Sequence, residues 1–150
     1  MDLYRRAALL AQLRPFGLDE NPPATAMAFP FVTLDEFFTG NDDTRSLGPQ
    51  IDATHPGMDT LLARLRAIAA RPDVDVLLVQ VRDAQWAYDS EDEWVSGNCV
   101  VVVTCAGADE VAHWRRELGC TAIAKGLPEP LAPNPPALRE GYAAWQLVWT

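Results

Sequence analysis

Residues 98–104 read NCVVVVT, and this stretch decides the fold. Valine is β-branched and favours strands. Four valines in succession give the run no polar face, so a strand here is buried on both sides, which is typical of the inner strands of a sheet. The sequence therefore predicts a sheet in which residues 98–104 form a central strand.

The segments on either side predict the other strands and the helices. Apolar runs rich in β-branched and aromatic residues predict strands over 28–34, 74–81, 121–127 and 142–149. Apolar residues at helical spacing, together with capping and stop signals, predict helices over 2–13, 34–39, 58–71 and 108–118. In the last strand, alternation places Trp145, Leu147 and Trp149 on one face.

The order of elements between residues 28 and 127 is β-α-β-β-α-β. It predicts an α+β fold with a ferredoxin-like core, in which helices pack on one face of an antiparallel sheet. The helix at 2–13 and the strand at 142–149 are additions to that core. A three-layer α/β fold with some parallel pairing is the alternative. Because the chain has neither a repeat nor a linker, we expect residues 1–150 to form a single domain.

A net charge of −9 narrows the range of partners. An acidic surface repels the phosphates of nucleic acids and anionic lipid head groups, so we expect neither nucleic acid nor membrane as a partner. No apolar run approaches the roughly 20 residues of a membrane-spanning helix. The N-terminus lacks a signal-peptide pattern, so the expected location is cytoplasmic.

Several kinds of chemistry are disfavoured by what the sequence lacks. The three cysteines are odd in number and have no CxxC spacing, which argues against a disulfide framework and a structural zinc site. There is no GxGxxG, P-loop, GxSxG or HExxH motif. We therefore expect no cofactor and lean against an enzyme.

The acidic stretch DEFFTGNDDTRSLG, residues 35–48, has a structural and a functional interpretation. Thr33 and Glu36 have the spacing of a capping box, and the glycine and asparagine at 40 and 41 are typical of a helix end. The structural interpretation is therefore preferred. The alternative is a metal or ligand site, for which the candidate residues are Asp35, Glu36, Asp42, Asp43 and His55.

A second acidic stretch, DAQWAYDSEDEWVSG at residues 83–97, carries interleaved aromatic residues and no Lys or Arg. Tyrosine and tryptophan are enriched among the anchors of protein interfaces, and acids around them favour a basic partner. In the competing interpretation, the tryptophans fold beneath the loop and the acids are simply solvated. The candidate partner-binding residues are Trp86, Tyr88, Asp89, Glu91, Asp92 and Trp94.

Three short motifs carry a resemblance to known sequences. TLDEFFTGN at 33–41, HPG at 55–57 and RPDV at 71–74 resemble a group of short uncharacterised bacterial proteins. The likeness spans about residues 33–149. It implies a bacterial origin and one compact domain. No established activity belongs to that group, so the resemblance implies no catalytic residue.

Three hypotheses about function follow. The first is a non-catalytic protein-binding module with a basic partner, for example an immunity-type protein that masks a basic enzyme. The second is a metal-dependent enzyme or small-molecule binder that uses the region from Asp35 to Asp43 with His55. The third is a homo-oligomer that pairs through Trp145 and Trp149 on an edge strand at the C-terminus.

Overall fold

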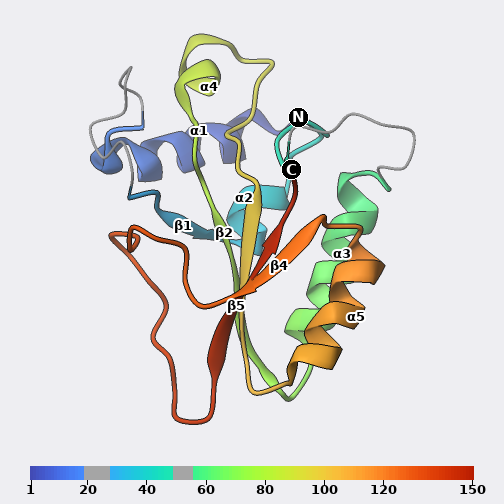
Figure 1. Cartoon of the computed structure of the whole chain (residues 1–150). Coiled ribbons are helices and arrows are strands. Elements are labelled where there is room, and N and C mark those ends of the chain that lie inside the picture. The colour runs from blue at the N-terminus through green and yellow to red at the C-terminus, as the bar shows by residue number, and fades with distance from the viewer. Residues whose placement is uncertain (19–27, 49–55) are drawn as a thin grey trace.

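The computed structural model describes residues 1–18, 28–48 and 56–150. Five strands form one antiparallel sheet in the order β1-β2-β3-β5-β4 (Figure 1). The strands are β1 (Phe31–Thr33), β2 (Val74–Gln80), β3 (Cys99–Thr104), β4 (Ala122–Lys125) and β5 (Ala143–Val148). The α-helices are α1 (Leu3–Leu13), α2 (Leu34–Phe38), α3 (Met58–Ala69), α4 (Gln85–Asp89) and α5 (Ala108–Leu118), and the 3-10 helix η1 (Arg14–Phe16) follows α1.

The prediction for the valine stretch is confirmed. β3 lies between β2 and β5, and all six of its residues are buried. Val100 and Val102 belong to the large core beneath the helices, whereas Val101 and Val103 belong to a smaller core on the opposite face. The sheet therefore needs a cover on each side.

Different kinds of structure cover the two faces. Helices supply the core on one side, where α3 and α5 lie side by side (Figure 1). On the other side, the extended segment between β4 and β5 covers the sheet with Leu127, Ala132 and Tyr142. In the same segment, Asn134 accepts from the Phe31 N–H at 2.9 Å and donates to the Phe31 carbonyl at 2.8 Å. A side chain thus occupies the place of a neighbouring strand beside β1.

The α+β class, with helices on one face of an antiparallel sheet, is confirmed. The connectivity differs from the ferredoxin-like arrangement, which would place the first and third strands side by side. Instead β1 pairs with β2, and β5 lies between β3 and β4. Every strand pairing among the described residues is antiparallel, unlike the three-layer alternative. In this inner position β5 contributes Leu147 to the helical core, and Trp149, directly after the strand, packs there as well.

Two predictions about faces were wrong. β5 is not an edge strand, Trp149 is buried and Trp145 is half-buried, so the proposed pairing of exposed tryptophans at a sheet edge has no basis. In α1, the helical spacing of Leu3, Ala7, Leu10 and Leu13 predicts an apolar face, but Leu3 and Ala7 are exposed. The buried face consists of Arg6, Leu9, Leu10 and Leu13, which have the same spacing displaced around the helix.

The capping box at α2 is confirmed. The Glu36 N–H donates to Thr33 Oγ1 at 3.1 Å, and the Thr33 N–H donates to Glu36 Oε1 at 2.8 Å. After α2 the chain turns at Gly40, which has a φ of 81°. A Cβ at Gly40 would lie 2.5 Å from the Asp2 Cβ, and the Asp2 N–H donates to the Gly40 carbonyl at 2.9 Å. Gly40 therefore lets α1 begin directly against this turn.

Replacing Gly40 by alanine should lower the free energy of unfolding by about 2 kcal/mol or more, because a strained φ and a steric contact both oppose it. Gly141→Ala is the matched control, since Gly141 has a φ of 82° and open space around its Cβ position. It should cost only the conformational part, about 1 kcal/mol. Urea denaturation of both variants measures the difference, and equal losses would contradict the steric role of Gly40.

Candidate functional site

A buried arginine positions the connection between β2 and β3. Arg6 of α1 is 8% exposed, and its guanidinium donates to the carbonyl oxygens of Ala87, Ser90 and Glu93, the last at 2.8 Å. Carbonyls at the end of a short helix such as α4 lack partners within the helix. A planar guanidinium can satisfy several acceptors at once. Arg6 therefore holds the end of α4 and the residues after it against α1.

The three aromatic residues of this connection have different surroundings. Trp94 is 3% exposed and packs in the helical core. Tyr88 is half-buried, donates its hydroxyl to the Leu10 carbonyl and has the Arg14 guanidinium 4.9 Å from its ring centre. Trp86 is 66% exposed. Of the three, Trp86 is therefore the one that exposes most of its ring to solvent.

A pocket of about 410 Å³ lies beside Trp86 and joins the two acidic stretches of the sequence. Its lining comes from the turn after α2 and from the β2–β3 connection. The two segments are tied together by backbone bonds, from the Gly97 N–H to the Ser46 carbonyl at 2.8 Å and from the Gly48 N–H to the Gly97 carbonyl at 2.7 Å. The lining residues are Asp43, Arg45, Ser46, Asp83, Trp86, Ala87, Glu93, Trp94 and Ser96.

The charge of this pocket is negative. Three carboxylates, those of Asp43, Asp83 and Glu93, face one guanidinium, that of Arg45. Arg45 lies 3.4 Å from an oxygen of Asp43 and 3.4 Å from an oxygen of Glu93, so it offsets only part of the charge. The carboxylates of Asp89, Glu91 and Asp92 add further negative charge on the exposed part of the connection. We call Trp86, the pocket and these three acids the acidic surface.

The other acids of the first stretch each hold a partner of their own. Asp35 accepts from Thr39 and lies near Arg5 and Arg66, and the Thr39 hydroxyl, followed by Arg5, lowers the pKa of Asp35. Asp42 pairs with the N-terminal amine at 3.0 Å. Glu36 belongs to the capping box. Within residues 1–18, 28–48 and 56–150, no group of three or more His, Cys, Asp or Glu residues could hold a metal ion, and His55 lies outside these ranges.

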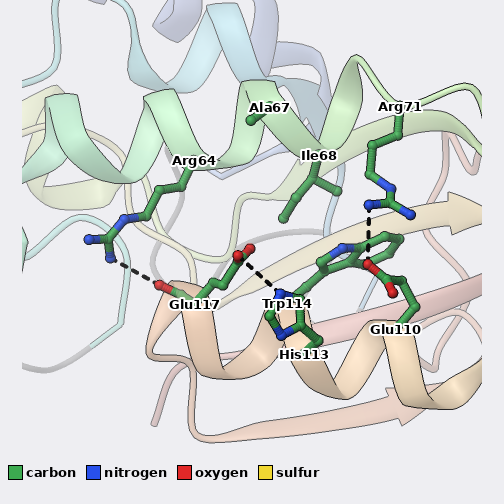
Figure 2. A pocket seen from close by; sticks show the side chains of 8 residues that line it. All are labelled: Arg64, Ala67, Ile68, Arg71, Glu110, His113, Trp114 and Glu117. Carbon is green, nitrogen blue, oxygen red and sulfur yellow. Dashed lines mark hydrogen bonds and ion pairs between the residues drawn. The ribbon is translucent and has the colours of Figure 1, made fainter.

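The groove between α3 and α5, about 490 Å³ in volume, is a second candidate (Figure 2). At one end of the groove, Arg71 contacts three other side chains. Its guanidinium makes two bonds to Asp73, at 2.9 and 3.0 Å, lies 3.1 Å from Glu110 and stacks 5.2 Å above the Trp114 ring. The bond from Arg71 lowers the pKa of Asp73, and Asp73 in turn raises the pKa of Arg71. The arginine of the RPDV motif therefore bridges the two helices.

The polar groups at the other end of the groove are also engaged with each other. Arg64 donates to the Glu117 carbonyl at 2.9 Å, and His113 lies 3.1 Å from the Glu117 carboxylate (Figure 2). A ligand entering the groove would have to compete with these contacts. These hydrogen bonds and ion pairs hold α3 and α5 together over the buried Trp114. The polar residues of the groove therefore have a structural role.

The fold and the sites together define a class: a small acidic α+β protein with an exposed tryptophan beside a negatively charged pocket. The chain belongs to the Uncharacterized protein YfbO family, which matches residues 5–147. This match agrees with the resemblance to uncharacterised proteins. No curated protein and no solved structure matches the chain. None of the helices in the described ranges has both the length and the apolar character to span a membrane.

Arg6→Met should lower the free energy of unfolding by about 2–4 kcal/mol, because buried carbonyls would lose their donor. It should also loosen α4, seen as faster amide exchange over residues 84–94. Arg5→Met is the matched control, since Arg5 is exposed and its ion pairs contribute about 0–1 kcal/mol. Similar losses in the two variants would contradict the positioning role of Arg6.

The Arg71–Asp73 pair predicts a dependence on pH. The pKa of Asp73 is lower in the folded protein than the ordinary 3.8, so its contribution to stability is present above that value and is lost as the pH falls through the folded pKa. Asp73→Asn should therefore destabilise the protein at neutral pH, with a difference from the parent that shrinks in acid. Asp92→Asn is the control. A difference independent of pH would refute the ion-pair explanation.

Proposed function

We propose that this protein is a non-catalytic protein-binding module whose contact region is the acidic surface. The observation that carries the proposal is the 66% exposure of Trp86 next to a pocket lined by three carboxylates. Tryptophan is enriched among the residues that anchor protein interfaces. The surrounding acids determine the charge of the partner that fits.

The partner is a basic protein that inserts a lysine or arginine side chain beside Trp86. A cation over the tryptophan face is attracted by the ring, and the excess carboxylate charge of the pocket favours it further. Asp89, Glu91 and Asp92 lie outside the pocket, where their charge would speed the encounter rather than tighten the final contact. The net charge of −9 acts in the same direction at longer range.

The residues of the acidic surface have unequal roles in this proposal. Trp86 and the carboxylates of the pocket make the contact, and Asp89, Glu91 and Asp92 attract the partner from outside it. Trp94 forms the floor beneath them and Tyr88 fastens α4 to α1, so neither is an anchor for the partner. Arg6 is a positioning residue, because it holds the loop that carries Trp86.

Two of the three cysteines are unsuited to act as nucleophiles. Burial raises the pKa of Cys99 to about 12 and that of Cys120 to about 11. Both thiols are therefore protonated at neutral pH and are poor nucleophiles. An immunity-type protein, which neutralises a basic enzyme by covering its surface, is the concrete form that charge and size favour. That form rests on analogy with other small acidic proteins.

The proposal predicts that proteins retained from a lysate of the source organism depend on the acidic surface. The test compares the parent with Trp86→Ala and with a triple variant, Asp89→Asn, Glu91→Gln and Asp92→Asn. We expect a basic protein to bind at about 50 mM salt, more weakly at about 300 mM, because exposed charges are screened within roughly 10 Å at 0.1 M salt. Trp86→Ala should lose most of this binding at both salt concentrations, and the triple variant should lose most of the additional binding seen at about 50 mM salt.

A second triple variant controls for net charge alone. Asp59→Asn, Asp109→Asn and Glu140→Gln remove the same number of exposed acids from other parts of the surface. It should retain the partner nearly as well as the parent. The proposal is wrong if both triple variants bind alike, or if nothing basic is retained at either salt concentration.

A further inference from the structure

A third pocket, of about 370 Å³, lies on the opposite face of the sheet from α3 and α5. The pairing register of three strands places the residues of its floor side by side. Gln80 of β2 pairs with Cys99 of β3, and Cys99 pairs with Val148 of β5, so the three residues form one row across the sheet. Gln146 is two residues before Val148 on the same strand and therefore shares that face. The Pro128–Pro130 segment forms a wall.

Two carboxamides in this floor have fixed orientations. The Gln80 amide nitrogen donates to the Phe29 carbonyl at 3.1 Å, and the Gln146 amide nitrogen donates to the Gly126 carbonyl at 3.1 Å. Because a carbonyl oxygen cannot pair with another oxygen, these contacts assign the side-chain oxygens as acceptors. Neither side-chain oxygen accepts a hydrogen bond from the described residues, and neither is a fully buried atom, since among these residues Trp94 Nε1 alone is buried without a partner. Both oxygens are therefore accessible from the pocket as acceptors for a donor on a ligand.

The two charged residues of the pocket, Arg82 and Glu129, come from different parts of the fold. Arg82 donates to the Asn98 side-chain oxygen at 3.4 Å, so these two donors lie together beyond the ends of β2 and β3. Glu129 lies three residues after Gly126, the residue whose carbonyl Gln146 contacts. Glu129 belongs to the segment between β4 and β5 and Gln146 to β5, whereas Arg82 follows β2 and Asn98 precedes β3. Phe29, with the Arg82 guanidinium 4.9 Å from its ring centre, and the prolines give apolar walls.

We propose that this pocket binds a small zwitterion of the amino-acid type. The carboxylate of the ligand pairs with Arg82 and the Asn98 amide, and its ammonium donates to Glu129 and to the Gln146 oxygen. Guanidinium and carboxylate are the usual groups for recognising these two ends. Cys99 in the floor is protonated, because burial raises its pKa to about 12, so the site binds without covalent chemistry. The pocket is separate from the acidic surface, and either proposal can fail alone.

The test uses the purified full-length chain labelled with ¹⁵N and the common L-amino acids, added singly at about 10 mM so that millimolar affinities are detected. We expect at least one amino acid to shift the side-chain amide signals of Gln80 and Gln146 in a saturable way. Arg82→Gln and Glu129→Gln should each weaken its binding by about tenfold or more, as expected when a charged hydrogen bond is lost. Arg116→Gln and Glu140→Gln, exposed and outside the pocket, should leave it unchanged.

Two compounds that each carry only one charged end of an amino acid distinguish recognition of the zwitterion from binding of a single charge. Acetate should bind more weakly than the amino acid and depend on Arg82 alone, and ethylammonium should bind weakly and depend on Glu129 alone. The proposal is overturned if no amino acid shifts the two glutamine signals, or if acetate binds as well as the best amino acid and Glu129→Gln has no effect.

Discussion

Burial of β3 on both faces is the constraint from which the rest of the structure follows. Val100 and Val102 require an apolar cover on one side, and Val101 and Val103 require a second cover on the other. The helices supply the first and the segment between β4 and β5 supplies the second. Each cover leaves a pocket where it meets the end of a strand or a connection, and the two pockets proposed as binding sites lie at such places.

Much of the fold could be predicted from the sequence, because local patterns determine which residues form each element and which face they bury. The helices at 58–69 and 108–118 and the capping box of Thr33 and Glu36 are examples. The order of strands could not be predicted in the same way. Alternation assigns Trp145, Leu147 and Trp149 to one face, yet it does not say which strands lie on either side. Only the assembled sheet shows that β5 separates β3 from β4.

The candidate site was predictable in composition but not in geometry. The acidic and aromatic character of residues 83–97 is plain in the sequence, but Trp86 and Trp94 look equivalent there, and the fold buries one and exposes the other. Arg6 left a signal that was missed. It occupies the first position of an i, i+3, i+4, i+7 series with Leu9, Leu10 and Leu13, so the series itself places a charged residue on a buried face. A charge in such a position implies a set of polar partners, here the carbonyls around α4.

The bonds around β1 have a consequence for self-association. The Phe31 N–H is taken by Asn134 and the Thr33 N–H by Glu36, so side chains of the same molecule occupy the two donors that point away from β2. A strand from another molecule could therefore not form backbone hydrogen bonds with these N–H groups of β1. Open-ended fibre growth needs two receptive edges on each subunit, whereas a two-fold pair needs one. By closing the β1 edge of its sheet, the protein removes one of the two edges that a continuous cross-β filament would need.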